Sequence, residues 1–177
     1  MPDPALSTLI PLDAIDPAEV ERGLDLAFGP DRHGRTAYAI RQGTDWLPAL
    51  SFAALDEQGV LVGTIQAWPV ALADPAGRAY PLIMVGPLAI LPDRQGRGFG
   101  RALMAAQAAA IETIGSEGNG PLPQVLIGDA PYYGRFGFVE APRGWTCPGS
   151  WDPARLLIRG VSAAVLPREG TLGPWLG

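Results

Sequence analysis

The sequence contains no lysine, one cysteine (Cys147) and one histidine (His33). A single cysteine cannot form an intrachain disulfide or a zinc site built from cysteines, and a single histidine argues against His-rich metal sites and a Ser-His-Asp triad, so we expect no metal. Because lysine is absent, all 13 positive charges are arginines, and with 18 acidic residues the net charge is −5. This balance does not predict a basic face for nucleic acid, and it favours a cationic or amine-bearing partner.

Long hydrophobic runs are also missing. Two uncharged stretches, residues 58–73 and 79–92, are interrupted by glycine and proline and are shorter than the roughly 20 residues of a membrane helix. The first positive charge is Arg22, so the N-terminus has neither the basic start nor the apolar block of a secretory signal. We therefore expect a cytoplasmic protein of bacterial type that does not enter a membrane.

The chain of 177 residues, 47% of them apolar, is long enough for one sizeable core, and we expect a single domain over residues 1–177. Its 23 glycines and 19 prolines interrupt apolar runs instead of forming a tract, which excludes disordered and collagen-like classes. No repeat period is present. The pattern indicates one alternating α/β unit.

Turn residues and hydrophobic periodicity divide the chain into expected elements. Strands are expected at residues 6–12, 50–55, 60–70, 80–91, 124–127, 138–140 and 156–159. Helices are expected at residues 16–28, 34–43, 98–114 and 131–136. The strand, helix and strand between residues 80 and 127 imply a parallel pair, whereas the strands before them form antiparallel hairpins.

Two of these helices carry specific signals. Asp16 is expected to cap the first one, with Pro17 in its first turn and Glu19 three residues after the cap. The helix over 98–114 has an apolar stripe that should be buried. This stripe consists of Leu103, Met104, Ala108, Ile111 and Ile114.

Pro87 interrupts the strand expected over residues 80–91. Proline cannot donate a ladder hydrogen bond, and Gly86 before it suits a bulge, so the strand should kink there and separate from a neighbour. The separation would leave backbone groups of Leu88, Ala89 and Ile90 unpaired on one edge. An extended ligand that carries amides, such as a pantetheine arm, could pair with them.

A glycine-rich and arginine-rich segment over residues 94–101 opens the next helix. Free N–H groups at a helix N-terminus favour phosphate, so a pyrophosphate would fit here, with added contacts from Arg94, Arg97 or Arg101. The segment lacks the Gly-Lys-Ser/Thr of a P-loop and the glycine spacing of a dinucleotide-binding fingerprint. The alternative is a tight turn without a ligand.

These motifs carry a family resemblance. Gln95-Gly96-Arg97-Gly98-Phe99-Gly100 matches the pattern Gln/Arg-x-x-Gly-x-Gly/Ala, and the sequence resembles the GNAT superfamily of acetyl-CoA-dependent N-acetyltransferases. More narrowly, GPLAILPDRQGRGFGRAL and IGDAPYYGRFGF are similar to the YhbS-like predicted acetyltransferases, and the similarity extends from Asp16 to about Ala141. The resemblance implies an α/β fold of GNAT type, in which helices flank a mixed, mostly antiparallel sheet with a splayed parallel strand pair. The coenzyme-binding core would span about residues 80–140, and the tail over 141–177 would complete the sheet and the acceptor pocket.

The resemblance also implies roles for residues at these motifs. Backbone groups of Leu88, Ala89 and Ile90 would bind the pantetheine of acetyl-CoA, the cosubstrate. Loop amides would hold its pyrophosphate. The residues implied for the pyrophosphate are Gln95, Gly96, Arg97, Gly98, Phe99, Gly100 and Arg101.

The expected chemistry needs a proton donor and a base. The segment from Tyr133 to Phe138 matches the family element Tyr-x-x-x-Gly-Phe, which implies that Tyr133 is the general acid for the departing thiolate. The alternative for Tyr133 is packing without proton transfer. Asp129, at a strand end, is a candidate base, although helix capping is the alternative for it, and a water chain could replace any base. Glu57 and His33 are weaker candidates.

The sequence therefore predicts an acyltransferase that moves acetyl from acetyl-CoA to a primary amine, by direct attack in a ternary complex. A small-molecule acceptor is expected, with an acceptor site formed by the N-terminal helices, the loop around Trp46 and the tail. A non-catalytic acyl-CoA sensor on the same fold, another acyl donor and a protein amine acceptor remain as alternatives. The resemblance also implies a homodimer.

Overall fold

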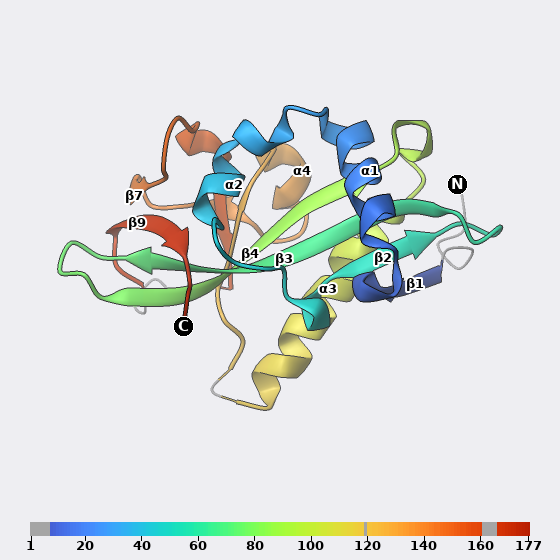
Figure 1. Cartoon of the computed structure of the whole chain (residues 1–177). Helices are drawn as coiled ribbons and strands as arrows, with labels where there is room; N and C mark the ends of the chain where they lie inside the picture. Colours follow the sequence, from blue (N-terminus) through green and yellow to red (C-terminus); the bar gives the residue numbers. More distant parts are fainter. Residues whose placement is uncertain (1–7, 119, 161–165) are drawn as a thin grey trace. The chain divides into compact units, whose positions relative to one another are not determined.

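The computed structural model describes residues 8–118, 120–160 and 166–177. The chain divides into two compact units, which are described separately. The first comprises Met1–His33, Trp46–Ala67 and Gly86–Gly120, and the second comprises Gly34–Asp45, Trp68–Val85 and Pro121–Gly177. Strands β3 (Leu61–Ala73) and β4 (Ala79–Ile90) each contribute to both units (Figure 1).

The strands form a mixed sheet that is mostly antiparallel. Its order is β1-β2-β3-β4-β5-β8-β6, and β9 pairs with both β3 and β7. The pairs β4–β5 and β7–β9 are parallel. The expected fold class, with helices beside a mixed sheet and a parallel pair after the central strand, is confirmed.

Unit one begins with β1 (Thr8–Pro11), a 3-10 helix (Leu12–Ala14) and α1 (Pro17–Phe28). Residues 6 and 7 of the expected first strand lie outside the described residues. The side chain of Asp16 accepts a hydrogen bond of 3.0 Å from the amide of Ala18, and Pro17 occupies the first turn. Gly29, with a φ of 91°, ends the helix. The expected capping and bounds of α1 are therefore confirmed.

Strand β2 (Phe52–Leu55) pairs antiparallel with β1 and β3 in unit one. It begins two residues later than expected because Pro48–Leu50 forms a 3-10 helix. The side chain of Asp56 accepts the amides of Gln58 and Val60, each at 2.9 Å, which closes the expected turn into β3. Strand β3 is longer than expected and ends at Ala73.

Helices α1 and α3 (Phe99–Ser116) bury apolar side chains in unit one, Val20 and Leu24 from α1 and Leu103, Met104 and Ile111 from α3. The cluster beneath α1 contains the buried residues Leu12, Val20, Leu24, Ala53 and Ala89.

The stripe of α3 differs from the expectation. Ile114 is 45% exposed, Ala108 is half-buried, and Gln107 is buried in their place. A helical wheel gives the angle of a side chain but not how far along the helix its packing partners extend, and Ile114 lies near the end of α3.

Unit two contains the remaining elements. The short helix α2 (Thr36–Ile40) covers only part of the expected 34–43, whereas β5 (Gln124–Ile127) and β8 (Leu156–Arg159) have the expected bounds. Helix α4 (Ala130–Gly134) is shorter than expected and is followed by β6 (Val139–Glu140). Strands β7 (Gly144–Thr146) and β9 (Glu169–Pro174) were not expected. Figure 1 shows β9 beside β3, with which it pairs.

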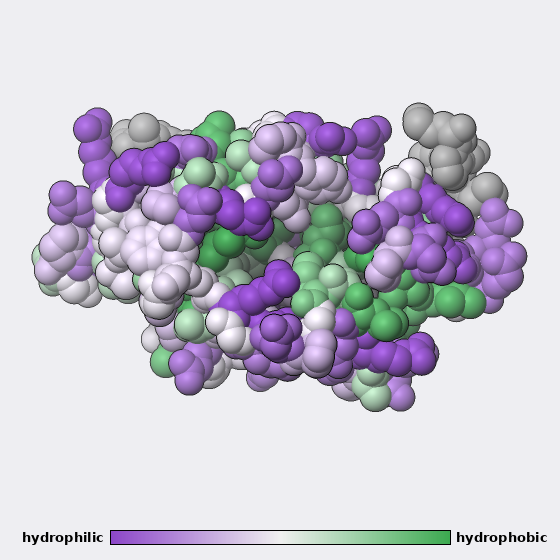
Figure 2. All heavy atoms as spheres, turned by 90° about the horizontal axis from the view of Figure 1, so that it is seen from above, coloured by the Kyte–Doolittle hydropathy of each residue, from purple (hydrophilic) through white to green (hydrophobic). Residues whose placement is uncertain are grey.

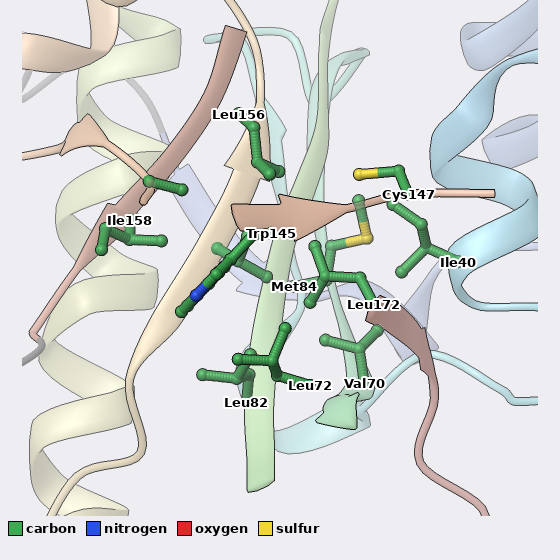
Figure 3. Close-up of a cluster of buried hydrophobic side chains, with 12 residues drawn as sticks. Ile40, Val70, Leu72, Leu82, Met84, Trp145, Cys147, Leu156, Ile158 and Leu172 are labelled. Carbon is green, nitrogen blue, oxygen red and sulfur yellow. The ribbon is translucent and has the colours of Figure 1, made fainter. Parts of the chain in front are cut away.

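The core of unit two surrounds the indole of Trp145 (Figure 3). The Nε1 of Trp145 donates a hydrogen bond of 2.9 Å to the carbonyl of Pro167, so its one polar group is paired. Cys147 is a buried, free cysteine of the same cluster, and burial raises the pKa of its thiol to about 11. The side chain of Asp74 closes the expected turn between β3 and β4 by accepting the amides of Ala76 and Arg78.

The surface is mainly polar on the face drawn in Figure 2, where hydrophobic residues are visible in smaller patches. Among the described residues, no helix has both the length and the apolar character required to cross a membrane.

Candidate functional site

The pairing of β4 with β5 ends just before Gly86 and Pro87, where the sequence predicts that the strand separates from a neighbour. Two residue pairs join the strands, Ile83 with Gln124 and Met84 with Val125. Gly86 follows with a φ of 108°, and the bond to Pro87 is cis. Strand β4 itself continues to Ile90, so the interruption affects its pairing more than its extended backbone.

One edge of the β4 segment after Pro87 is held by β3, within unit one. The amide of Leu91 donates a hydrogen bond of 2.9 Å to the carbonyl of Val62. At Gly63 an added Cβ would lie 2.6 Å from Cδ1 of Ile90 and 3.1 Å from the carbonyl oxygen of Ala89, so a side chain there would have to displace the end of the Ile90 side chain and press on the β4 backbone. Among the described strand pairs, none joins β5 to residues 88–90.

The three residues expected at the pantetheine differ in burial. Ala89 is buried in the cluster beneath α1, whereas Leu88 and Ile90 are half-buried. In an extended strand the side chains alternate between faces while the N–H and C=O groups lie in the plane of the sheet. A ligand that pairs with this edge would therefore contact backbone atoms.

The glycine-rich loop leads from a 3-10 helix (Pro92–Arg94) into α3. Gly96 has a φ of 78° and Gly98, the N-cap residue, a φ of 87°, which is the left-handed region that favours glycine. At both positions an added Cβ would meet nothing within 4 Å, so glycine is required for its conformation and the space beside the backbone is open. No side chain caps α3. Its first amides, together with those of the loop, form a site suited to phosphate.

The arginines of this loop have different surroundings. Arg94 donates to Asp56 at 2.8 Å and lies 3.9 Å from Asp93. The backbone amide of Val60 and the guanidinium of Arg94 hold the pKa of Asp56 below its usual value, so this contact anchors the loop to the β2–β3 turn. Arg97 and Arg101 are exposed and form no ion pair within the described parts of the chain. Their charges are therefore available to an anion.

Tyr133 belongs to unit two, in α4. Its ring lies edge-on to the rings of Tyr132 and Phe138, with centroid distances of 4.9 and 6.2 Å. Burial, followed by the neighbouring Tyr132, raises the pKa of Tyr133 to about 12. The phenol therefore keeps its proton at neutral pH and can act as a hydrogen-bond donor or acid.

The ring of Tyr133 packs against the backbone of Gly128. An added Cβ at Gly128 would lie 2.5 Å from Cε2 of Tyr133 and 2.8 Å from Cδ2. Any side chain at this position would displace the ring. The glycine that follows β5 thus sets the place of the aromatic ring, within the same unit.

Asp129 is exposed at the N-cap position of α4, where its side chain makes no capping hydrogen bond. Its backbone carbonyl accepts the amide of Tyr133 at 2.9 Å. The other acidic or imidazole candidates, Glu57 and His33, are also exposed. In the parts of the chain that the structure describes, no group of three His, Cys, Asp or Glu residues could hold a metal ion.

Sequence reasoning missed a set of buried polar residues in unit one. Thr64 and Gln66 on β3 and Gln107 on α3 are each at most 3% exposed. Each also has a buried side-chain oxygen without a hydrogen-bond partner. Two polar residues at alternate positions of an apolar strand are a signal that could have identified the first two.

A family model of the acetyltransferase (GNAT) domain matches residues 48–140, which is more than half of the chain. A comparison with curated proteins found no match.

Solved structures resemble the chain over most of its length. A GNAT family acetyltransferase from Brucella melitensis, in complex with acetyl-CoA, is 25% identical with a TM-score of 0.61, and the match covers 96% of each chain. The GNAT family N-acetyltransferase YhbS from Escherichia coli, in complex with CoA, is 22% identical with a TM-score of 0.64, covering 99% of this chain and 93% of that one. Eis1 from Mycobacterium abscessus is 25% identical over 77% of this chain and 32% of its own, with a TM-score of 0.53.

Proposed function

Because this chain belongs to the GNAT acetyltransferase family, we propose that it transfers the acetyl group of acetyl-CoA to a primary amine of a small molecule. The proposal rests on two features that follow one another in unit one. A strand edge without a β5 partner, at residues 88–90, leads directly into an open glycine-rich loop at an uncapped helix N-terminus. An extended arm and a pyrophosphate are the parts of CoA that these features suit.

The proposal assigns the coenzyme contacts as follows. Backbone groups of Leu88, Ala89 and Ile90 pair with the amides of pantetheine. The amides of residues 95–101 surround the pyrophosphate, where the unpaired guanidiniums of Arg97 and Arg101 add charge. Arg94 supports the loop through Asp56.

The reaction joins the two substrates directly. The amine nitrogen attacks the thioester carbonyl carbon, the C–N bond forms as the C–S bond breaks, and the sulfur leaves as a thiolate that takes up a proton. We assign this proton to the hydroxyl of Tyr133, whose pKa of about 12 keeps it protonated at neutral pH. Asp129 or a chain of waters accepts the proton that the substrate ammonium loses to become the neutral, attacking amine.

Other parts of the proposal rest on the sequence. We retain the single domain over residues 1–177, a cytoplasmic location and a homodimer as predictions. A non-catalytic acyl-CoA sensor is the competing function, and it would use the same loop without turnover.

Thermal unfolding with added ligand tests coenzyme binding. Acetyl-CoA and CoA should raise the melting temperature of the wild type, because a ligand at about 100 times its Kd adds about 2.7 kcal/mol to the free energy of unfolding. Inorganic pyrophosphate alone should give a smaller rise. In Gly98→Asp a carboxylate beside the anion site should abolish both shifts.

Gly77→Asp is the matched control, because Gly77 has the same φ of 87° and equally open surroundings in a turn of the other unit. It should carry a similar backbone strain and keep the full coenzyme shift. If millimolar acetyl-CoA leaves the wild type unshifted, or if both aspartate variants lose the shift equally, the loop is a plain turn and the coenzyme assignment is wrong.

Measuring turnover distinguishes the proposed enzyme from the alternative of a non-catalytic sensor. Thiol release from acetyl-CoA, measured over a panel of primary amines, should occur in the wild type and fall in Tyr133→Phe while coenzyme binding is retained. Coenzyme binding without thiol release, in the wild type as well as in the variant, would favour the sensor.

A further inference from the structure

Two unpaired oxygen atoms lie inside unit one, on strand β3. Thr64 is 3% exposed and Gln66 is 2% exposed. Among the described residues, neither Oγ1 of Thr64 nor Oε1 of Gln66 has a hydrogen-bond partner, and both atoms are shielded from solvent. Buried polar groups are normally paired, so each such oxygen needs an explanation.

Both side chains lie on the face of the sheet that α1 covers. Thr64 pairs with Ala53 of β2, and residues directly opposite each other in an antiparallel pair point to the same face. Ala53 belongs to the buried cluster beneath α1. An added Cβ at the preceding residue, Gly63, would instead contact Leu103 of α3. Since side chains alternate along a strand, Thr64 and Gln66 share the α1 face, about 7 Å apart.

Several backbone groups around Gln66 are paired with side chains. The Nε2 atom of Gln107 donates to the carbonyls of Gln66 and Leu50, at 3.0 and 2.8 Å. Ser51 donates to the carbonyl of Leu47 at 2.8 Å and accepts the amide of residue 67 at 3.1 Å. These hydrogen bonds fix β3 beside the residues that precede β2, and the side-chain oxygens of Thr64 and Gln66 take no part in them.

The pair also lies beside the β4 segment that is proposed to hold pantetheine. Strands β3 and β4 are neighbours joined by a tight turn, so they run in opposite directions. The bond between Leu91 and Val62 sets their alignment. Moving along β3 from Val62 toward Gln66 therefore means moving along β4 from Leu91 back toward Pro87, where the β4–β5 pairs have ended.

We propose that Thr64 and Gln66 form a hydrogen-bond acceptor subsite that receives the N–H groups of the amine substrate beside the coenzyme strand. This inference rests on the proposed function and names residues that hold its acceptor substrate. An ammonium group has three donors and no acceptor, which matches two oxygens that lack a donor. A hydrogen bond to a charged donor at a site shielded from water is stronger than one at the surface.

Direct binding of a probe amine tests the subsite without requiring turnover. The probes are n-butylammonium and tetramethylammonium, which carry the same charge but differ in N–H donors. They are titrated at constant ionic strength, with and without saturating CoA. The wild type should bind n-butylammonium about tenfold more tightly, a ratio that corresponds to one charge-assisted hydrogen bond.

Gln66→Met removes the acceptor at nearly constant volume and should reduce that preference to less than about twofold. Gln58→Met makes the same change in the exposed β2–β3 turn and should keep the wild-type preference. Gln66→Glu retains acceptor oxygens and should restore it. Thr64→Val should weaken it several-fold. With n-butylamine as acceptor, Gln66→Met should raise KM about tenfold while the Kd of acetyl-CoA is unchanged.

Stability distinguishes a substrate subsite from a structural role. Because the unliganded chain buries these oxygens without a partner, Gln66→Met and Thr64→Val should leave the melting temperature unchanged or raised. A structural role, or a buried water held by the pair, predicts a lower melting temperature and no change in the preference between the two probes.

The proposal is overturned if the wild type shows no preference for n-butylammonium, or if Gln66→Met and Gln58→Met show the same preference. If Gln66→Met does not fold, the result for Thr64→Val decides in the same way. Failure of the wild type to bind acetyl-CoA would overturn the proposed function alone, because the titration without CoA still tests the subsite.

Discussion

The contact between Gly128 and Tyr133 allows the phenol to be moved without being removed. In Gly128→Ala the new methyl would lie 2.5 Å from Cε2 of Tyr133, 2.8 Å from Cδ2 and 3.1 Å from Cδ1 of Leu126. Carbon atoms in contact are about 3.5 to 4.0 Å apart, so the ring must retreat by about 1 Å. It would retreat against Tyr132 and Phe138, whose rings are already in edge contact with it.

The sizes of the two effects follow from this displacement. A methyl forced into a packed site costs about 1 to 3 kcal/mol of unfolding free energy. If the hydroxyl of Tyr133 protonates the departing thiolate, a shift of about 1 Å lowers kcat by up to about 100-fold. The backbone contacts proposed for residues 88–90 and 95–101 are unchanged, so the Kd of acetyl-CoA should not move.

Gly134→Ala is the matched control. Gly134 is the last residue of α4, and an added Cβ there meets nothing within 4 Å. Alanine is favoured over glycine in a helix, so this variant should be as stable as the wild type or slightly more stable, with normal turnover.

Urea unfolding gives the stability of each variant, and thiol release under saturating substrates gives kcat. In a Tyr133→Phe background, Gly128→Ala should still destabilise the chain, because the ring remains, but it should lower kcat no further. A Gly128→Ala variant that is destabilised yet keeps full turnover would refute a catalytic role for the position of Tyr133. An unchanged free energy of unfolding would refute the packing argument itself.

Two further predictions concern stability. Burial raises the pKa of Tyr133 from 10.0 to about 12 and that of Cys147 from 9.0 to about 11, so the folded chain keeps protons that the unfolded chain loses. The contribution of these two groups to the free energy of unfolding should therefore be constant below about pH 9 and fall as the pH rises toward 12, and urea unfolding of Cys147→Ala should lose the part of this fall between pH 9 and 11. Gln107→Leu leaves the carbonyls of Leu50 and Gln66 without their donor and should cost about 2 to 4 kcal/mol in urea unfolding; a cost near zero would mean that water replaces the amide.

Elements with local signals could be predicted from the sequence. Helix α1 begins where Asp16 accepts an amide and ends at Gly29, and both residues act on their immediate neighbours. Strands β5 and β8 are short, mainly apolar runs bounded by glycine, proline or arginine, and they have the expected bounds. Such signals do not depend on the rest of the fold.

Strands β7 and β9 could not be predicted because glycine has a different role there. Glycine normally marks a turn, and the segments Gly144–Thr146 and Glu169–Pro174 resemble loops for that reason. In the structure, an added Cβ at Gly144 would lie 2.5 Å from the carbonyl oxygen of Arg168, and one at Gly170 would lie 2.7 Å from that of Ala73. These glycines allow strands to approach closely, and that requirement arises only when the partner strand is present.

The same distinction separates the two halves of the proposed site. The glycines of the loop are required by their own backbone angles, so the motif is recognisable without knowledge of the fold. Thr64 and Gln66 are buried on β3, and periodicity alone assigns such positions to apolar residues. Gln107 lies in the buried stripe of α3, where its amide donates to the carbonyls of Leu50, before β2, and of Gln66 on β3. A helical wheel of α3 does not contain these partners. A coenzyme site made of backbone groups can therefore be predicted from the sequence, because its glycines are recognisable there. A proposed acceptor site made of unpaired side-chain oxygens can be identified only in the structure, once the hydrogen-bond partners of the surrounding polar groups are known.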